Sequence, residues 1–112
     1  MKVLIASDLH GAAQATSLLV KRIEEEKPTD ILLLGDILYH GPRNDLPRDY
    51  APKEVIAMLN ARKADIYNVR GNCDTEVDQM VLEFPVLTEY MLIPISGAVA
   101  PPVIFATHGH IY

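Results

Sequence analysis

The sequence predicts an α/β fold with a mostly parallel sheet and helices on one face. Short apolar, β-branched runs at residues 2–6 and 31–34 are typical of buried parallel strands, and a helical stretch between them completes a βαβ unit. Two successive right-handed crossovers would place both connecting helices on the same face of the sheet. With 112 residues, 49% hydrophobic and 22% charged, the chain has the size and composition of one globular domain.

Two helices are expected to form these crossovers. The first has apolar side chains at the three- and four-residue spacing of one helical face: Ala15, Leu18, Leu19 and Ile23. Pro28 is expected to end it. The second begins near Pro52, whose fixed φ suits a first helical turn. Its apolar side chains also lie on one side: Val55, Ile56 and Leu59.

The remaining elements are shorter. Residues 66–69 are expected to form a third strand, residues 76–84 a short helix, and residues 90–95 and 103–106 two further strands. Residues 41–50 form a long loop rich in proline and charge. A loop of this length in a compact domain is either functional or a solvated connector, and composition favours neither.

Composition excludes several classes of partner. The net charge is −5 and no basic run is longer than Lys21-Arg22, so no duplex nucleic-acid partner is expected. The apolar stretch at residues 3–6 is too short for a signal-peptide core or a membrane span, so no membrane association is expected. The single cysteine, Cys73, cannot form an internal disulfide and fits a reducing compartment, which predicts a cytoplasmic protein.

Side chains that can bind a metal lie just after the apolar runs: Asp8, His10, Asp36, Asn72 and His108. Binding sites in open α/β sheets form outside the carboxyl ends of the strands, where these side chains can converge. Converging carboxylates repel each other unless a cation lies between them. Each residue alone is more often a helix cap, a turn residue or a structural histidine. Their joint occurrence at four strand ends favours a catalytic metal centre, and mixed oxygen and imidazole ligands suit Mn, Fe or Zn.

Four segments resemble the motifs of the calcineurin-like metallophosphoesterases: Asp8-Leu9-His10-Gly11, Gly35-Asp36, Gly71-Asn72-Cys73-Asp74 and Thr107-His108-Gly109-His110. Two further segments, residues 39–44 and 76–80, are similar to one bacterial branch, the YfcE-type phosphodiesterases. The resemblance implies that residues 1–112 form a single domain, the N-terminal part of an αββα sandwich.

The resemblance also implies a centre of two divalent cations, with Mn favoured and Mg, Fe, Zn, Ni or Co as alternatives. Asp8 and His10 would bind the first ion, Asn72 and His108 the second, and Asp36 both. The implied reaction is hydrolysis of a small phosphodiester by in-line attack of a metal-bound hydroxide, with Asp36, Asn72 and His108 as catalytic residues.

Five further residues are candidate substrate contacts: His40, Arg43, Asn44, Cys73 and His110. Cys73 stands where the family usually has a histidine that can act as a general acid, and a thiol is a poor replacement. Activity is therefore expected toward good leaving groups, such as aryl diesters, or with another acid. His40 is the nearest alternative acid, although it also fits a plain surface loop.

A second interpretation rests on the C-terminal end of the sequence. The family carries a final Gly-His-x-His motif that completes both metal spheres, and this sequence reaches Tyr112 without one. The domain is therefore expected to be incomplete at its C-terminus, and later sequence or a homo-oligomer would cover the free face of the sheet. The alternative function is a catalytically weak or inactive scaffold that binds proteins, as one retromer subunit resembling this family does.

Overall fold

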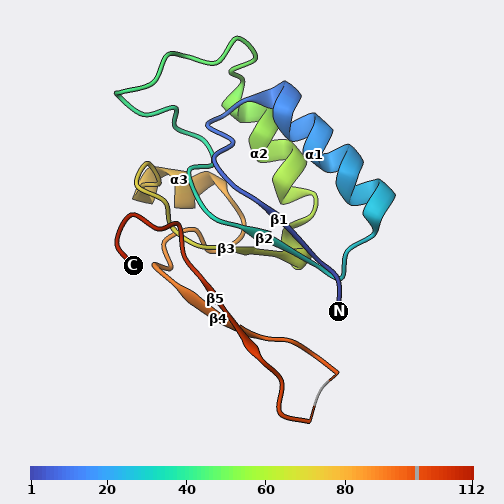
Figure 1. The fold of residues 1–112 in the computed structure, drawn as a ribbon. Helices are drawn as coiled ribbons and strands as arrows, with labels where there is room; N and C mark the ends of the chain where they lie inside the picture. Colours follow the sequence, from blue (N-terminus) through green and yellow to red (C-terminus); the bar gives the residue numbers. More distant parts are fainter. Residues whose placement is uncertain (98) are drawn as a thin grey trace.

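The computed structural model, which describes residues 1–97 and 99–112, has a parallel sheet at its centre (Figure 1). The three strands lie in the order β1-β2-β3: β1 Val3–Ala6, β2 Asp30–Leu33 and β3 Ile66–Asn68. Leu32 of the middle strand pairs with Ile5 on one side and with Tyr67 on the other. All three predicted strands are confirmed, with small shifts at their ends.

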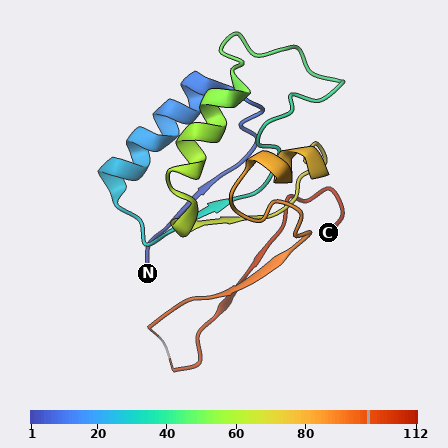
Figure 2. The same cartoon turned by 180° about the vertical axis from the view of Figure 1, so that it is seen from behind.

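Two helices, α1 (Ala13–Glu26) and α2 (Pro52–Asn60), lie side by side on one face of this sheet (Figures 1 and 2). Their buried side chains pack against those of β2 in the larger core cluster, for example Ile23 and Val55 against Leu33. The predicted α/β arrangement with helices on one face is therefore confirmed. In the part of the chain that the structure describes, no helix has the length and apolar character needed to cross a membrane.

The predicted buried face of α1 is partly wrong. Ala15 and Leu18 are both exposed, whereas Thr16 and Ile23 are buried. The hydroxyl of Thr16 donates a hydrogen bond to the carbonyl oxygen of Ala12 at 2.9 Å, so this polar side chain is buried without an unpaired group. A rule that counts only apolar residues misses such a position.

The third helix, α3 (Glu76–Val81), is shorter than the predicted 76–84 because Leu82 has an extended backbone with ψ 132°. It begins with a capping box in which the Thr75 amide donates to Asp78 Oδ2 at 3.0 Å. Burial raises the pKa of Asp78, because a carboxylate loses solvation there. A short 3₁₀ turn, η1 (Lys63–Asp65), precedes β3 and was not predicted.

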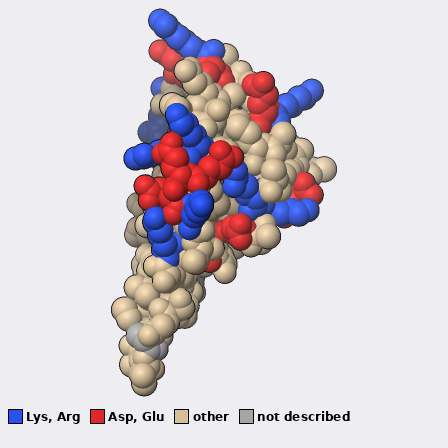
Figure 3. All heavy atoms as spheres, turned by 90° about the vertical axis from the view of Figure 1, so that its right-hand side faces the viewer, with Lys and Arg blue, Asp and Glu red and all other residues tan. Residues whose placement is uncertain are grey.

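Two antiparallel strands, β4 (Met91–Pro94) and β5 (Val103–Ala106), form a hairpin on the other face of the parallel sheet (Figures 1 and 2). Ile93 and Ala106 pack against Leu32 and Val69 in a second core cluster. The hairpin therefore covers part of the face that the sequence left open. Residues 90–112 contain no Asp, Glu, Lys or Arg, and the tapering end of the molecule accordingly shows no charged side chains (Figure 3).

The long loop at residues 41–50 has a structural role at its end. Asp49 Oδ2 accepts hydrogen bonds from the amides of Gln14 (2.7 Å) and Ala15 (3.1 Å), and the Asp49 carbonyl accepts one from Ala13. The first turn of α1 lacks a side-chain cap from its own N-cap residue, Ala12. Asp49 therefore satisfies amide groups that would otherwise lack partners.

Replacing Asp49 with alanine should lower the free energy of unfolding by about 1 kcal/mol, the usual cost of removing a helix cap. Urea unfolding followed by circular dichroism measures the change. Asp45→Ala, an exposed position in the same loop, is the matched control and should be close to neutral. Equal stability of the two variants would contradict the capping role.

Candidate metal centre

The other four predicted ligands lie around one side chain, Asp36. Its Oδ2 lies 3.7 Å from His10 Nε2 and 3.5 Å from His108 Nε2. Asp8 Oδ1 lies 3.2 Å from His10 Nε2, and Asn72 Oδ1 lies 2.9 Å from His108 Nε2. Loops after four strands therefore deliver these groups to the carboxyl end of the parallel sheet.

The two histidines direct their Nε2 nitrogens toward the centre. His10 Nδ1 lies 2.8 Å from the Tyr39 carbonyl oxygen, and His108 Nδ1 lies 2.6 Å from that of Leu34. A carbonyl oxygen only accepts, so each Nδ1 carries the hydrogen, and in a neutral ring Nε2 is left as a lone pair. Both Nε2 atoms face the carboxylate of Asp36. A neutral imidazole nitrogen and a carboxylate oxygen both accept hydrogen bonds, so they lie close together only when they share a proton or a cation. These side chains therefore fit a metal ion.

Two groups of three side chains could each hold a metal ion, because the ligand atoms within each group lie within 4.8 Å of one another. One group is Asp8, Asp36 and His108, and the other is His10, Asp36 and Cys73. Asp36 belongs to both groups, as expected for a bridging carboxylate. Cys73, predicted as a substrate contact, lies within reach of a metal bound by His10 and Asp36. How the ligands divide between two ions remains a prediction.

Three of the predicted ligands have a strained backbone. Asp8, His10 and Asp36 have φ values of 59°, 48° and 56°, in the left-handed region that residues with a side chain rarely adopt. Main-chain hydrogen bonds hold this geometry, from the Asp8 amide to the Gly35 carbonyl and from the His10 amide to the Asp36 carbonyl, both at 3.0 Å. Strain that concentrates on the ligands is typical of a functional site.

Asp74 organises the centre, although the sequence assigned it no role beyond membership of the third motif. It is 2% exposed. Its Oδ2 accepts hydrogen bonds from the amides of Asp36 (2.8 Å) and Gly71 (2.7 Å), and its Oδ1 accepts one from the amide of Ile37 (3.1 Å). One carboxylate therefore ties the loop after β2 to the loop after β3.

Gly71 is required by the close approach of these two loops. A Cβ atom at this position would overlap Asp36 Oδ1 and lie 2.7 Å from the Asp36 amide nitrogen. Next to it, the Cys73 amide donates to Asp36 Oδ1 at 2.8 Å. The backbone thus fixes one oxygen of Asp36 and leaves Oδ2 directed at the histidines.

The carboxyl group of Asp8 is biased toward its charged form. Burial raises the pKa of Asp8. A hydrogen bond from the Ser7 hydroxyl and the nearby His108 and His10 together lower it by more, so the net shift of the pKa is downward. A carboxylate that stays ionised is available as a ligand across the physiological range.

The Cys73 thiol is biased toward its neutral form. Burial raises its pKa, the Asp36 carboxylate adds to the increase, and the charge of Arg43 partly opposes it. The thiol of the metal-free protein therefore stays protonated near neutral pH. Arg43, another predicted substrate contact, is thus near enough to Cys73 to affect the pKa of its thiol, although the Arg43 side chain is exposed.

The other predicted substrate contacts lie outside the ligand cluster. His40 lies between the rings of Tyr39 and Tyr50, at centroid distances of 5.0 and 5.5 Å, and its buried Nδ1 has no hydrogen-bond partner among the described residues. Asn44 Nδ2 donates to the His40 carbonyl at 2.8 Å, which stabilises the loop. His110 is exposed, with its ring 5.3 Å from that of His108.

Asp74→Asn should destabilise the fold and weaken metal binding together, because the amide group turns a donor toward backbone amides. The free energy of unfolding should fall by about 2 kcal/mol, the usual cost of an unsatisfied buried polar group. Urea unfolding and metal titration calorimetry measure the two effects. Asp65→Asn, exposed before β3, is the control. Unchanged stability and metal affinity would refute the organising role of Asp74.

Alkylation of Cys73 by iodoacetamide should be slow in the folded, metal-free protein. A raised pKa leaves less thiolate at any given pH, so the midpoint of the rate against pH should lie above that of the same chain unfolded in guanidinium. The chain has one cysteine, so total thiol loss reports on this site alone. A folded-state midpoint below the unfolded one would contradict the assignment.

The chain is similar to proteins of known name along its whole length. Phosphodiesterase YfcE of Escherichia coli K12 is 40% identical over 112 residues, which are 100% of this chain and 59% of that protein. The corresponding phosphodiesterase of an E. coli O157:H7 strain matches to the same extent. The chain thus spans about three fifths of the length of these curated relatives.

Solved structures show the same fold. The structure described as Yfce, a phosphoesterase from E. coli, has a TM-score of 0.93 and 40% identity, and the match covers 99% of this chain and 59% of that one. A predicted phosphoesterase from Streptococcus pneumoniae shares the fold at a TM-score of 0.53 and 20% identity, covering 99% and 47%. The family model for calcineurin-like phosphoesterases matches residues 1–112, and this family implies divalent metal ions. The chain therefore belongs to the calcineurin-like phosphoesterase family.

Proposed function

We propose that the chain provides the metal centre of a phosphodiesterase that hydrolyses small phosphodiesters. The observation that carries the proposal is the position of Asp36 Oδ2, which lies between the inward nitrogens of His10 (3.7 Å) and His108 (3.5 Å). The name of the E. coli relatives, phosphodiesterase, supports the same reaction.

Five side chains would hold two divalent ions: Asp8, His10, Asp36, Asn72 and His108. Asp36 would be the ligand common to both ions, since its Oδ1 is fixed by the Cys73 amide while Oδ2 stays directed at both histidines. When bound, the cations supply Lewis-acid charge that activates water and neutralises phosphoryl oxygens. Mn²⁺ is our choice of ion because the ligands mix carboxylate, amide and imidazole groups.

The chain's own residues would orient the substrate around this centre. Arg43 lies close enough to Cys73 to lower the pKa of its thiol, and it offers the phosphate a positive charge. The protonated Cys73 adds no negative charge that would repel the phosphate, but it is a weak acid for a leaving group. Substrates whose leaving group needs no proton, such as aryl diesters, suit this arrangement. His40, Asn44 and His110 are assigned secondary contacts in the surrounding loops.

We infer a cytoplasmic location from the single unpaired cysteine, and a small diester rather than duplex nucleic acid as partner from the acidic charge. The scaffold alternative is not favoured. A scaffold has no use for three ligands in strained backbone conformations or for imidazole nitrogens directed at a carboxylate.

Hydrolysis of bis(para-nitrophenyl) phosphate with added Mn²⁺ tests the proposal. Asp36→Ala should reduce the rate by more than about 100-fold, beyond the loss usual for residues that only orient a ligand. Asp45→Ala is the control and should keep the rate. Activity that survives Asp36→Ala, or that does not need a divalent ion, would refute the proposed function.

A further inference from the structure

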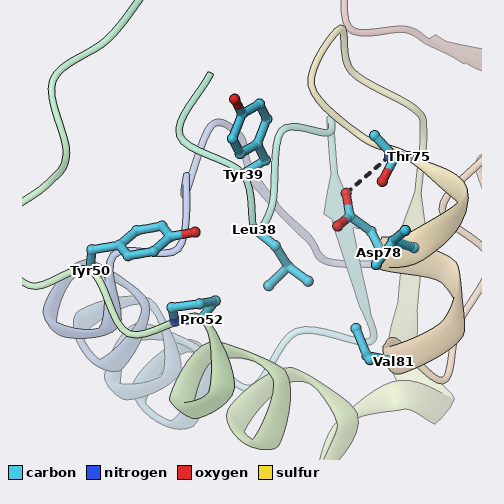
Figure 4. A pocket seen from close by; sticks show the side chains of 8 residues that line it. Leu38, Tyr39, Tyr50, Pro52, Thr75, Asp78 and Val81 are labelled. Carbon is cyan, nitrogen blue, oxygen red and sulfur yellow. Dashed lines mark hydrogen bonds between the residues drawn. The ribbon is translucent and has the colours of Figure 1, made fainter. Parts of the chain in front are cut away.

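A pocket of about 400 Å³ lies between the segment that follows β2, the start of α2 and the helix α3 (Figure 4). Its walls are mostly apolar and aromatic: Leu38, Tyr39, Tyr50, Pro52, Val77 and Val81. The volume is within the range of small-molecule sites, which are typically apolar with a few placed polar groups. None of the predicted ligands or substrate contacts lines this pocket.

The pocket shares two walls with the candidate metal centre. The carbonyl oxygen of Tyr39 bonds His10 Nδ1 at 2.8 Å, while the side chain of Tyr39 lines the pocket. On the opposite side, Thr75 lines the pocket and directly follows Asp74, which holds the Asp36 amide. The pocket and the candidate centre therefore have the backbone segments at Tyr39 and at Asp74-Thr75 in common.

Asp78 supplies the polar group of the pocket. It is 8% exposed, and one carboxylate oxygen accepts the Thr75 amide hydrogen bond. Figure 4 shows its carboxylate facing Leu38 across the pocket, with Tyr39 and Tyr50 on the other side. The second oxygen is an acceptor placed in an apolar setting, where a ligand N–H would gain most from pairing.

Both the aromatic walls and the acceptor select the same kind of ligand. Tyr39 is 41% exposed, so a planar ring can pack against it without displacing the core. An anion is disfavoured by Asp78, and an aliphatic chain would leave the acceptor without a partner. The complementary ligand is a flat aromatic ring that carries an N–H donor.

We propose that this pocket binds an amino-bearing aromatic ring, such as a nucleobase, of the phosphodiester substrate, with Asp78 accepting its N–H and Tyr39 packing against its face. The proposal rests on the proposed function for its link to the phosphate. Binding of the ring itself needs no metal, so this inference and the proposed function can be refuted separately.

Binding of adenosine to the metal-free chain, measured by saturation-transfer NMR, is the direct test. Val77→Trp fills the pocket from a side chain that is 67% exposed, and it should weaken binding by about tenfold or more. Met80→Trp, on the same helix and 82% exposed, adds the same ring outside the pocket and should bind like the wild type. Circular dichroism checks that both variants fold.

A second probe tests the role of Asp78. Adenosine whose exocyclic amine carries two methyl groups has the same ring system without that donor, and it should bind about tenfold more weakly. Absence of saturable adenosine binding, or equal binding by the two tryptophan variants, overturns the pocket assignment. Equal binding of the two nucleosides overturns the role of Asp78. Diester hydrolysis without adenosine binding refutes only this inference, whereas binding without metal-dependent hydrolysis refutes only the proposed function.

Discussion

The carboxylate of Asp74 is the constraint on which the rest of the centre depends. A buried carboxylate is costly unless its oxygens are hydrogen-bonded, and Asp74 receives three backbone amides from two separate loops. These bonds bring the loop after β2 against the loop after β3, so closely that only glycine fits at position 71. The position of Asp36, and through it the distances to both histidines, depends on this contact.

The backbone also determines which atoms of three predicted ligands, His10, His108 and Asp36, stay free. Carbonyl oxygens accept hydrogen bonds from Nδ1 of His10 and His108, and the Cys73 amide donates to one oxygen of Asp36. His10, His108 and Asp36 are thus each oriented by the main chain. Such an outer shell reduces the reorganisation required when a cation binds.

Secondary structure and the parallel sheet were predictable from the sequence, and individual hydrogen bonds between distant loops were not. The strands, the start of α2 at Pro52 and the ligands at the strand ends could be derived from local periodicity and from the geometry of parallel sheets. Asp49 caps a helix 35 residues earlier, and Asp74 bonds an amide 38 residues earlier; no local pattern marks either contact. Thr16 was missed for a different reason, because a hydroxyl that bonds its own helix is buried as readily as a methyl group.

The bond from His108 to Leu34 spans 74 residues and comes from the segment after the hairpin strand β5. This histidine reaches Asp36 only when β4 and β5 are packed on the sheet, so completing the centre and docking the hairpin are one equilibrium. Contacts of such sequence separation are slow to form, because the entropy of closing the loop opposes them. By mass action, whatever binds the completed centre also favours the docked hairpin. A cation that bound here would therefore also stabilise the packing of the hairpin on the sheet.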